Sequence, residues 1–123
     1  MGQAWRDDQP IYRQIRDRVV AAVLEGGLKE GEALPSVRQV AVDLQVNPLT
    51  VSKAYQELAD EGLIERRRGV GMFVVEGARA ALTRREREVF LKEEWPALLE
   101  RIRRLGLDPD TLLKSDNQRE TSR

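Results

Sequence analysis

Residues 36–58 read SVRQVAVDLQVNPLTVSKAYQEL, and this segment carries the clearest signals of secondary structure in the chain. Ser36 and the glutamine three residues after it predict an N-terminal capping box, and apolar side chains follow at helical spacing. Gln45-Val46 is expected to form a tight turn. Asn47 then predicts the cap of a second helix, with Pro48 at its first position, where the missing N–H does no harm. Two helices joined by so short a turn must cross each other, as in a helix-turn-helix unit.

The apolar positions of these two helices predict which faces are buried. The inward side chains are Val37, Val40, Ala41 and Leu44 in the first helix and Val51, Ala54, Tyr55 and Leu58 in the second. At about 100° per residue, a second set then points outward: Leu49, Ser52, Lys53 and Gln56, with Thr50 on the flank. The role of Tyr55 stays open between core packing and a contact with a phosphate.

A further helix precedes this pair and a β-hairpin follows it. The first helix is expected to start near Pro10 and end at Gly26-Gly27, with an apolar stripe between them. Residues 63–67 and 72–75 predict two short strands joined by residues 68–71, two of which are glycines. Strand alternation predicts that Arg66 and Arg68 share one face and Arg67 the other. A lone hairpin is marginal in water, so we expect it to lie on the helices.

The pattern becomes helical again after residue 77. Thr83 and Glu86 predict another capping box. Apolar residues then recur at alternating spacings of four and three, which is a heptad seam typical of helix pairing. With one neighbouring leucine, they are the predicted dimerisation residues: Leu91, Trp95, Leu98, Leu99, Ile102 and Leu105. Pro96 is expected to kink or restart the helix, and Asp108 with Pro109 predicts a last short helix.

Together these patterns predict a mainly α fold with a small β-hairpin. An N-terminal winged helix-turn-helix is followed by a short C-terminal helical dimerisation region. The expected segments are a leader (1–9), the winged helix-turn-helix domain (10–77), the dimerisation region (78–113) and a disordered tail (114–123).

The composition excludes several classes of function. The 123 residues include no cysteine and no histidine, which removes disulfides, thiolate metal sites and the commonest acid/base group at neutral pH. We therefore expect no enzyme, no catalytic residue, no metal and no cofactor. The sequence has no apolar run long enough to span a membrane and no signal-peptide core, so a cytoplasmic protein without a membrane partner is expected.

The charge balance bears on the partner. Lys+Arg and Asp+Glu are equal at 21 each, and residues 1–77 carry 10 basic against 12 acidic side chains. The bulk positive charge of many nucleic-acid binders is therefore missing, and local cations would have to attract DNA. The alternative is a winged-helix module that binds another protein without sequence-specific DNA binding.

The outward residues nevertheless have the chemistry of a DNA-reading surface. Lys53 can neutralise a phosphate or reach guanine, Gln56 can pair with adenine, and Leu49 can touch a thymine methyl group. The start of the preceding helix, with Ser36 and Arg38, suits a phosphate. Arg68 in the hairpin could enter a narrow minor groove. The predicted DNA-binding residues are Ser36, Arg38, Asn47, Leu49, Thr50, Ser52, Lys53, Gln56, Arg66, Arg68, Gly69 and Gly71.

Several motifs in residues 10–76 resemble the GntR family of bacterial transcriptional regulators. They are Leu34-Pro35-Ser36-x-Arg38, Val46-Asn47-Pro48-x-Thr50-Val51-x-Lys53-Ala54-Tyr55, Glu61-Gly62-Leu63-Ile64 and Gly69-x-Gly71-x-Phe73-Val74. The Asn-Pro-x-Thr-Val and Lys-Ala-Tyr elements look like its YtrA subfamily. Gln45 stands where many members have glycine, so a left-handed non-glycine residue is expected there. Pro48 replaces the arginine of other subfamilies, so their rule for reading bases does not carry over.

The resemblance implies a homodimer that binds inverted-repeat operators in double-stranded DNA and represses transcription, often of genes for ABC-type transporters. It also implies DNA contacts from all the residues named above except Gln56 and Arg66. A small-molecule effector of unknown identity could lodge at the dimer interface near Trp95. The alternative is that partner proteins, or the amount of this protein, control how much of the operator is occupied.

Overall fold

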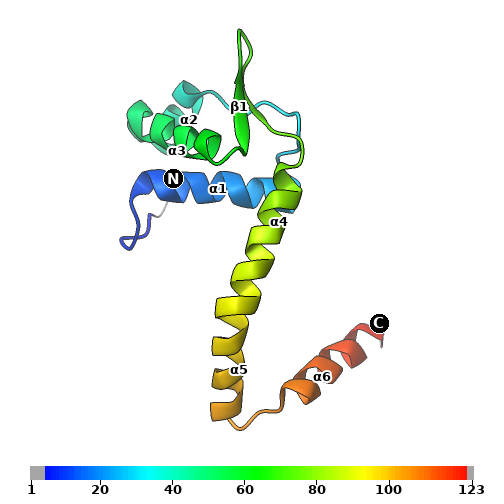
Figure 1. Ribbon diagram of the computed structural model, residues 1–123. Helices are drawn as coiled ribbons and strands as arrows, with labels where there is room; N and C mark the ends of the chain where they lie inside the picture. The colour runs from blue at the N-terminus through cyan, green and yellow to red at the C-terminus, as the bar shows by residue number, and fades with distance from the viewer. Residues whose placement is uncertain (1–4, 122–123) are drawn as a thin grey trace. The chain divides into compact units, whose positions relative to one another are not determined.

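The computed structural model describes residues 5–121, with side chains described as far as residue 115. The chain forms two compact units, residues up to 83 and residues from 84 onward. The first unit holds α1 (Ile11–Glu25), α2 (Val37–Leu44), α3 (Pro48–Asp60), β1 (Ile64–Arg67), β2 (Gly71–Val74) and the start of α4 (Ala78–Val89). In Figure 1, α1 runs alongside α2 and α3, and the hairpin projects beyond them.

The helix α1 begins after Pro10 and ends at Gly26, as its sequence predicts. Gly26 has a φ of 85°, the left-handed conformation that favours glycine at a helix end. The leader is bound to this helix through the buried side-chain amide of Gln14. Its oxygen accepts a hydrogen bond from the N–H of Arg6, and its nitrogen donates to the carbonyls of Arg6 and Gln9, all at 2.8–2.9 Å. The leader residues 1–4 lie outside the described residues.

The hairpin pairs in an antiparallel register, with Ile64 opposite Val74 and Arg67 opposite Gly71. The segment before α2 joins this sheet through a bridge between Ala33 and Phe73. The N–H of Val74 donates to the carbonyl of Glu32 at 3.0 Å. The edge of β2 is therefore partly paired, and the hairpin is anchored to the helical part of the unit.

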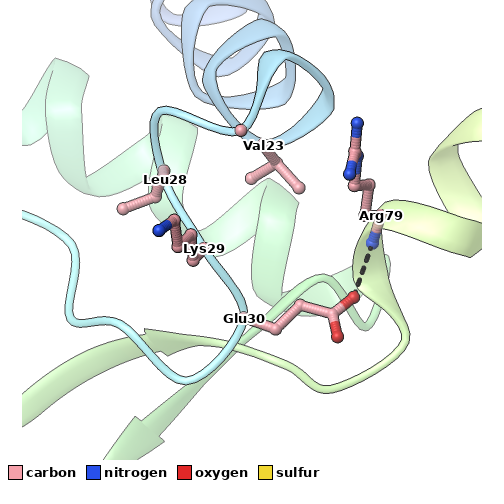
Figure 2. A pocket seen from close by; sticks show the side chains of 6 residues that line it. Val23, Leu28, Lys29, Glu30 and Arg79 are labelled. Carbon is pink, nitrogen blue, oxygen red and sulfur yellow. Dashed lines mark hydrogen bonds between the residues drawn. The ribbon is translucent and has the colours of Figure 1, made fainter.

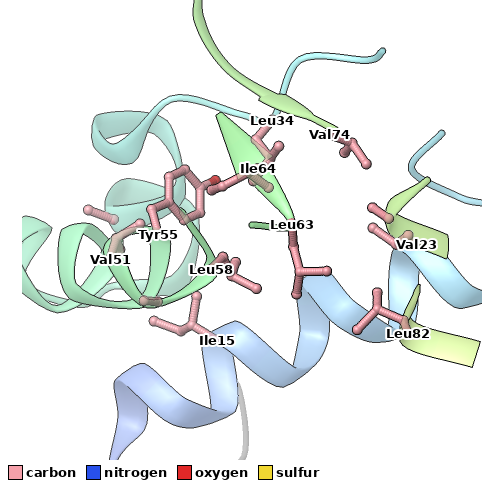
Figure 3. Close-up of a cluster of buried hydrophobic side chains, with 13 residues drawn as sticks. Ile15, Val23, Leu34, Val51, Tyr55, Leu58, Leu63, Ile64, Val74 and Leu82 are labelled. Atoms are coloured by element: carbon pink, nitrogen blue, oxygen red, sulfur yellow. The ribbon is translucent and has the colours of Figure 1, made fainter. Parts of the chain in front are cut away.

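The buried core joins all elements of the first unit (Figure 3). Val51, Ala54 and Leu58 of α3 are at most 1% exposed and belong to the same cluster as Ile15 of α1. Leu63, Ile64 and Val74 of the hairpin, with Leu82 of α4, complete the cluster. Because α3 contributes its whole apolar face to this core, its opposite face is left to solvent.

The start of α4 differs from the prediction. The helix begins at Ala78, and Thr83 is an interior residue whose hydroxyl donates to the carbonyl of Arg79 at 2.8 Å. The predicted capping box at Thr83 is therefore wrong. The helix starts earlier because Ala78 and Leu82 are buried in the core of the first unit, and this packing outweighs the local capping signal.

The second unit contains a π-helical turn, η1 (Phe90–Glu94), followed by α5 (Trp95–Arg104) and α6 (Pro109–Thr121). Pro96 has no N–H for the usual helical bond, and the N–H of Trp95 donates to the carbonyl of Phe90, five residues back. The wide turn is how the helix restarts at Pro96. Asp108 caps α6 by accepting from the N–H of Asp110 at 3.2 Å. This helix continues to Thr121, through most of the segment that was expected to be a disordered tail (114–123), and residues 122–123 lie outside the described residues.

The structure offers no membrane-crossing element: none of the helices in residues 5–121 has the necessary length and apolarity.

Candidate nucleic-acid interface

The start of α2 is the first part of the interface. Ser36 caps the helix, its hydroxyl oxygen accepting from the N–H of Gln39 at 3.1 Å. The return bond of the predicted capping box is absent, because the Gln39 amide donates to Asp43 instead, at 2.8 Å. Arg38 is exposed in the first turn. It makes no hydrogen bond or ion pair with the residues that the structure describes, so its guanidinium is available to an anion.

The turn between α2 and α3 contains a strained residue. Gln45 has φ 56° and ψ 49°, and no other non-glycine residue in the described part of the chain has a positive φ. The N–H of Val46 donates to the carbonyl of Ala41 at 3.0 Å, and that of Gln45 to Val42 at 3.3 Å. These two bonds are those of a Schellman motif, which usually has glycine at this position. The expected left-handed non-glycine residue is confirmed.

The helix α3 presents its N-terminal half to solvent. The Asn47 side chain caps it by accepting from the N–H of Leu49 at 2.8 Å, and Pro48 is its first residue. Leu49 is an apolar residue, yet its side chain is 76% exposed. Ser52 and Lys53 are also exposed, and Thr50 is half-buried on the flank. The structure thus brings five predicted DNA-binding residues together at the N-terminal end of α3: Asn47, Leu49, Thr50, Ser52 and Lys53.

Two other predicted residues of α3 have partners inside the protein. Gln56 lies one turn further along and donates its amide to Asp60 at 2.9 Å, so it stands apart from the cluster around Leu49. Tyr55 is buried, and its hydroxyl donates to the carbonyl of Pro35 at 2.7 Å. Burial raises the pKa of Tyr55 to about 12. Tyr55 is therefore a core residue that holds the segment before α2 against α3.

The tip of the hairpin carries three consecutive arginines in different settings. Arg67 is the last residue of β1, and its guanidinium lies 4.4 Å from the centre of the Phe73 ring. Arg66 is exposed and pairs across the hairpin with Met72. Arg68 lies past the end of the strand, in the turn. Because β1 ends at Arg67, the alternation of strand faces does not reach Arg68. The prediction that Arg68 shares a strand face with Arg66 therefore has no basis in the structure.

The glycines of the tip make the turn possible. Gly69 and Gly71 have φ values of 77° and 116°, which L side chains rarely adopt. The N–H of Val70 donates to the carbonyl of Arg67 at 3.0 Å and closes the turn. Arg68 and Gly69 are exposed there. The tip is thus a slender loop with one outward arginine.

Two acidic side chains of the first unit are paired with arginines of α1. The carboxylate of Glu61, at the end of α3, binds the guanidinium of Arg16 on α1, with Nε to Oε2 at 2.7 Å, and this hydrogen bond raises the pKa of Arg16. Glu57 forms an ion pair with Arg13 at 3.2 Å. Two acidic groups of α3 are therefore neutralised by α1.

A shallow hollow of about 430 Å³ lies where α1, the following loop and α4 meet (Figure 2). The carboxylate of Glu30 accepts from the N–H of Arg79 at 3.1 Å, and so caps the first turn of α4. Val23 and Leu28 line the apolar side of the hollow. No group of three or more acidic residues in the described chain is arranged to hold a metal ion.

Apolar side chains stand exposed along the end of α4 and the second unit. Those between 42% and 63% exposed are Val89, Phe90, Leu91, Leu98, Leu105, Leu107, Leu112 and Leu113. Of the other predicted dimerisation residues, Trp95, Leu99 and Ile102 are half-buried. Phe90 is not among the predicted dimerisation residues, yet it is exposed too, and its ring lies 6.3 Å from that of Trp95. The π turn adds one residue to the helical spacing before Trp95, and Pro96 is the sequence signal for an irregular turn there.

A helix-turn-helix with an exposed recognition helix, followed by a hairpin with an outward arginine, defines a winged helix-turn-helix DNA-binding domain. Residues 11–74 match the family described as "Bacterial regulatory proteins, gntR family". The chain belongs to this family of transcriptional regulators, and within it to the YtrA subfamily.

Individual relatives agree with this assignment. The chain is 47% identical over 77 residues to the HTH-type transcriptional repressor YtrA of Bacillus subtilis (strain 168), which covers 63% of this chain and 59% of the relative. It is 31% identical over 114 residues to the HTH-type transcriptional regulator YhcF of the same organism, with 93% of each chain covered. A crystal structure of a transcriptional regulator from Oenococcus oeni is similar with a TM-score of 0.72 and 30% identity, over 94% of this chain and 95% of that one. These relatives are regulators rather than enzymes.

Proposed function

We propose that this chain is a homodimeric transcriptional repressor that binds an inverted-repeat operator. The observation that carries the proposal is the exposed N-terminal end of α3, where Leu49, Ser52 and Lys53 face solvent while the opposite side of the helix is buried in the core. In helix-turn-helix proteins this end of the second helix reads base edges in the major groove. The caps at Ser36 and Asn47 fix both helices at their DNA-facing ends.

The cations around this helix would hold the duplex. Arg38 at the start of α2 and Arg68 at the hairpin tip are both exposed. Arg38 suits a backbone phosphate, and Arg68 suits the electronegative minor groove, with Gly69 allowing a close approach. Arg67 is the least suited of the three hairpin arginines, because its guanidinium rests on Phe73.

The dimer is supported by the exposed apolar side chains of the second unit. Leu98 and Leu105 are 44% and 63% exposed in the single chain. Full burial of a large apolar side chain contributes about 1.5–3 kcal/mol, and two copies of the stripe would supply it twice. Two-fold symmetry of the protein then implies two-fold symmetry of the operator.

Repression and the target genes rest on similarity. The YtrA relative is a repressor by name, and the resemblance implies genes of an ABC-type transporter as the target. A repressor of this kind is expected to block a promoter that its operator overlaps. The effector near Trp95 stays a prediction, and a ligand that binds there should raise the melting temperature.

The test uses fluorescence anisotropy with a labelled operator duplex at several salt concentrations. Arg38→Ala and Arg68→Ala are each expected to weaken binding. An arginine that neutralises one phosphate in each subunit should also lower the salt slope by about 2 for the dimer. Arg67→Ala is the matched control, with a smaller expected effect. Normal affinity in both test variants would remove these contacts, and a wild-type affinity independent of salt would favour the protein-binding alternative.

A further inference from the structure

A contact between α1 and the recognition helix has no role in the core. The ammonium of Lys53 lies 4.2 Å from the centre of the Tyr12 ring. Tyr12 is half-buried against the core, whereas Lys53 is exposed. An ammonium over an aromatic face is held by the electrostatic attraction of the ring. A side chain of the first helix thus restrains a cation on the DNA-reading end of α3.

This contact belongs to a row of three along α3. Lys53, Glu57 and Glu61 are spaced by four and share one face of the helix. Each contacts α1: Lys53 meets Tyr12, and the two glutamates meet Arg13 and Arg16. The two acidic members are neutralised by arginines, so only the member nearest the start of α3 keeps a net charge.

The chemistry of Tyr12 explains why that charge stays usable. A free lysine side chain loses about 2 kcal/mol of rotamer entropy when it is fixed, and a contact formed before binding reduces the part of this loss that falls on binding. A carboxylate at residue 12 would fix Lys53 equally well, but it would neutralise the ammonium and repel a phosphate. A neutral aromatic ring fixes the ammonium and leaves its charge for the DNA.

The geometry points to Tyr12 as a positioning residue for DNA binding: its ring holds the ammonium of Lys53 at the α1 side of the recognition helix, so that Lys53 neutralises a backbone phosphate instead of reading a base. This inference rests on the proposed function. Ser52 and Leu49 remain the residues of this helix end that face the bases.

The experiment compares Tyr12→Phe, Tyr12→Leu, Lys53→Met and the double variant Tyr12→Leu/Lys53→Met. Each full-length protein is titrated into a duplex selected from random DNA and into a scrambled duplex of the same length, at four salt concentrations. Lys53→Met should weaken binding to both duplexes by a similar factor and lower the salt slope by about 2 for the dimer. Tyr12→Phe keeps the aromatic face and should bind like the wild type.

Tyr12→Leu should weaken binding measurably, by up to about 30-fold for the dimer. The contact is already present in the free protein, so its removal acts on binding only by freeing the rotamers of Lys53, and the strength of one exposed cation–π contact in each subunit sets the upper limit of this effect. The loss should disappear in the Lys53→Met background. An NMR signal from the Lys53 ε-CH₂ protons, shifted upfield by the ring in the free protein, should return to its ordinary position in Tyr12→Leu and stay shifted in Tyr12→Phe. Thermal unfolding checks that each variant is folded.

Three results would overturn the inference: an equal loss from Tyr12→Leu with and without Lys53, a change of base preference in Lys53→Met, or an unshifted Lys53 signal in the wild type. If Tyr12→Leu does not fold, the effects of Lys53→Met and the position of the Lys53 NMR signal in the wild type and in Tyr12→Phe still test the inference. Failure of the proposed function would look different, because the wild type itself would then not distinguish the selected duplex from the scrambled one.

Discussion

The strained turn residue Gln45 gives a prediction whose size follows from the structure. A left-handed conformation costs a residue with a side chain roughly 1–2 kcal/mol, and Gln45 adopts it at φ 56° with its side chain exposed. Glycine adopts this conformation freely but loses about 0.5–1 kcal/mol more on folding. The variant Gln45→Gly should therefore raise the free energy of unfolding by about 0.5–1 kcal/mol, the difference of these two effects.

The measurement is urea unfolding of the full chain at one fixed protein concentration, followed by circular dichroism. A gain of this size corresponds to about 2–6 °C in melting temperature. Gln45→Ala is the matched control: it removes the same side chain and keeps the strain, so its stability should stay near that of the wild type. Operator affinity should stay within about twofold, since the Schellman bonds from Gln45 and Val46 use only backbone atoms.

The reasoning would be refuted if Gln45→Gly were no more stable than Gln45→Ala. That result would mean that the side chain of Gln45, and not its backbone conformation, determines how the turn is stabilised.

Three further predictions concern single contacts. Tyr55→Phe removes the hydrogen bond to Pro35 and should lower the free energy of unfolding by about 1 kcal/mol at neutral pH. Because the pKa of Tyr55 is raised to about 12, the greater stability of the wild type should persist up to about pH 10 and shrink as the pH rises towards 12. Urea unfolding across that pH range measures this difference. Arg16→Met should lower the free energy of unfolding by about 1–3 kcal/mol in the same assay, because it removes the arginine that binds the carboxylate of Glu61 at two points. Arg13→Met, at a half-exposed ion pair, should lower it by less than about 1 kcal/mol. Equal losses in the two variants would contradict the view that the more buried ion pair stabilises the protein more. Leu98→Glu should shift the protein towards monomer in sedimentation equilibrium and weaken operator binding, while Arg101→Ala should change neither, and a dimer that survives Leu98→Glu would exclude this stripe as the interface.

Much of the first unit is predictable because its signals are local. Ser36, Asn47 and Pro48 mark helix starts through their own side-chain or ring chemistry, and the structure confirms all three. The spacing of apolar residues likewise predicts the buried face of α3. The left-handed Gln45 follows from the shortness of the turn and from the glycine that the family usually has there.

Other features could not be predicted from one local pattern, because a side chain has more than one possible partner or because packing in the core decides the outcome. Thr83 and Glu86 match the capping pattern, but α4 begins five residues earlier because Ala78 and Leu82 are buried in the core. The amide of Gln39 has a choice of two partners and bonds to Asp43. The stacking of Lys53 on Tyr12 needs α1 and α3 to be packed together before it can be seen.

The heptad seam shows how a single residue can change a pattern. Pro96 was expected to restart the helix, and it does so through the π turn. The extra residue in this turn places Phe90 beside Trp95. Sequence spacing alone assumes a uniform helix, so it gave no reason to pair Phe90 with Trp95.

If two copies of the chain present two recognition helices to one duplex, selection of bound sequences from random duplex DNA should reveal the symmetry of this arrangement. We expect enriched sequences with two inverted half-sites, whose centres are separated by about one helical turn or a multiple of it, bound by two chains. Enrichment of a single asymmetric site bound by one chain, or no enrichment over the starting pool, would contradict it.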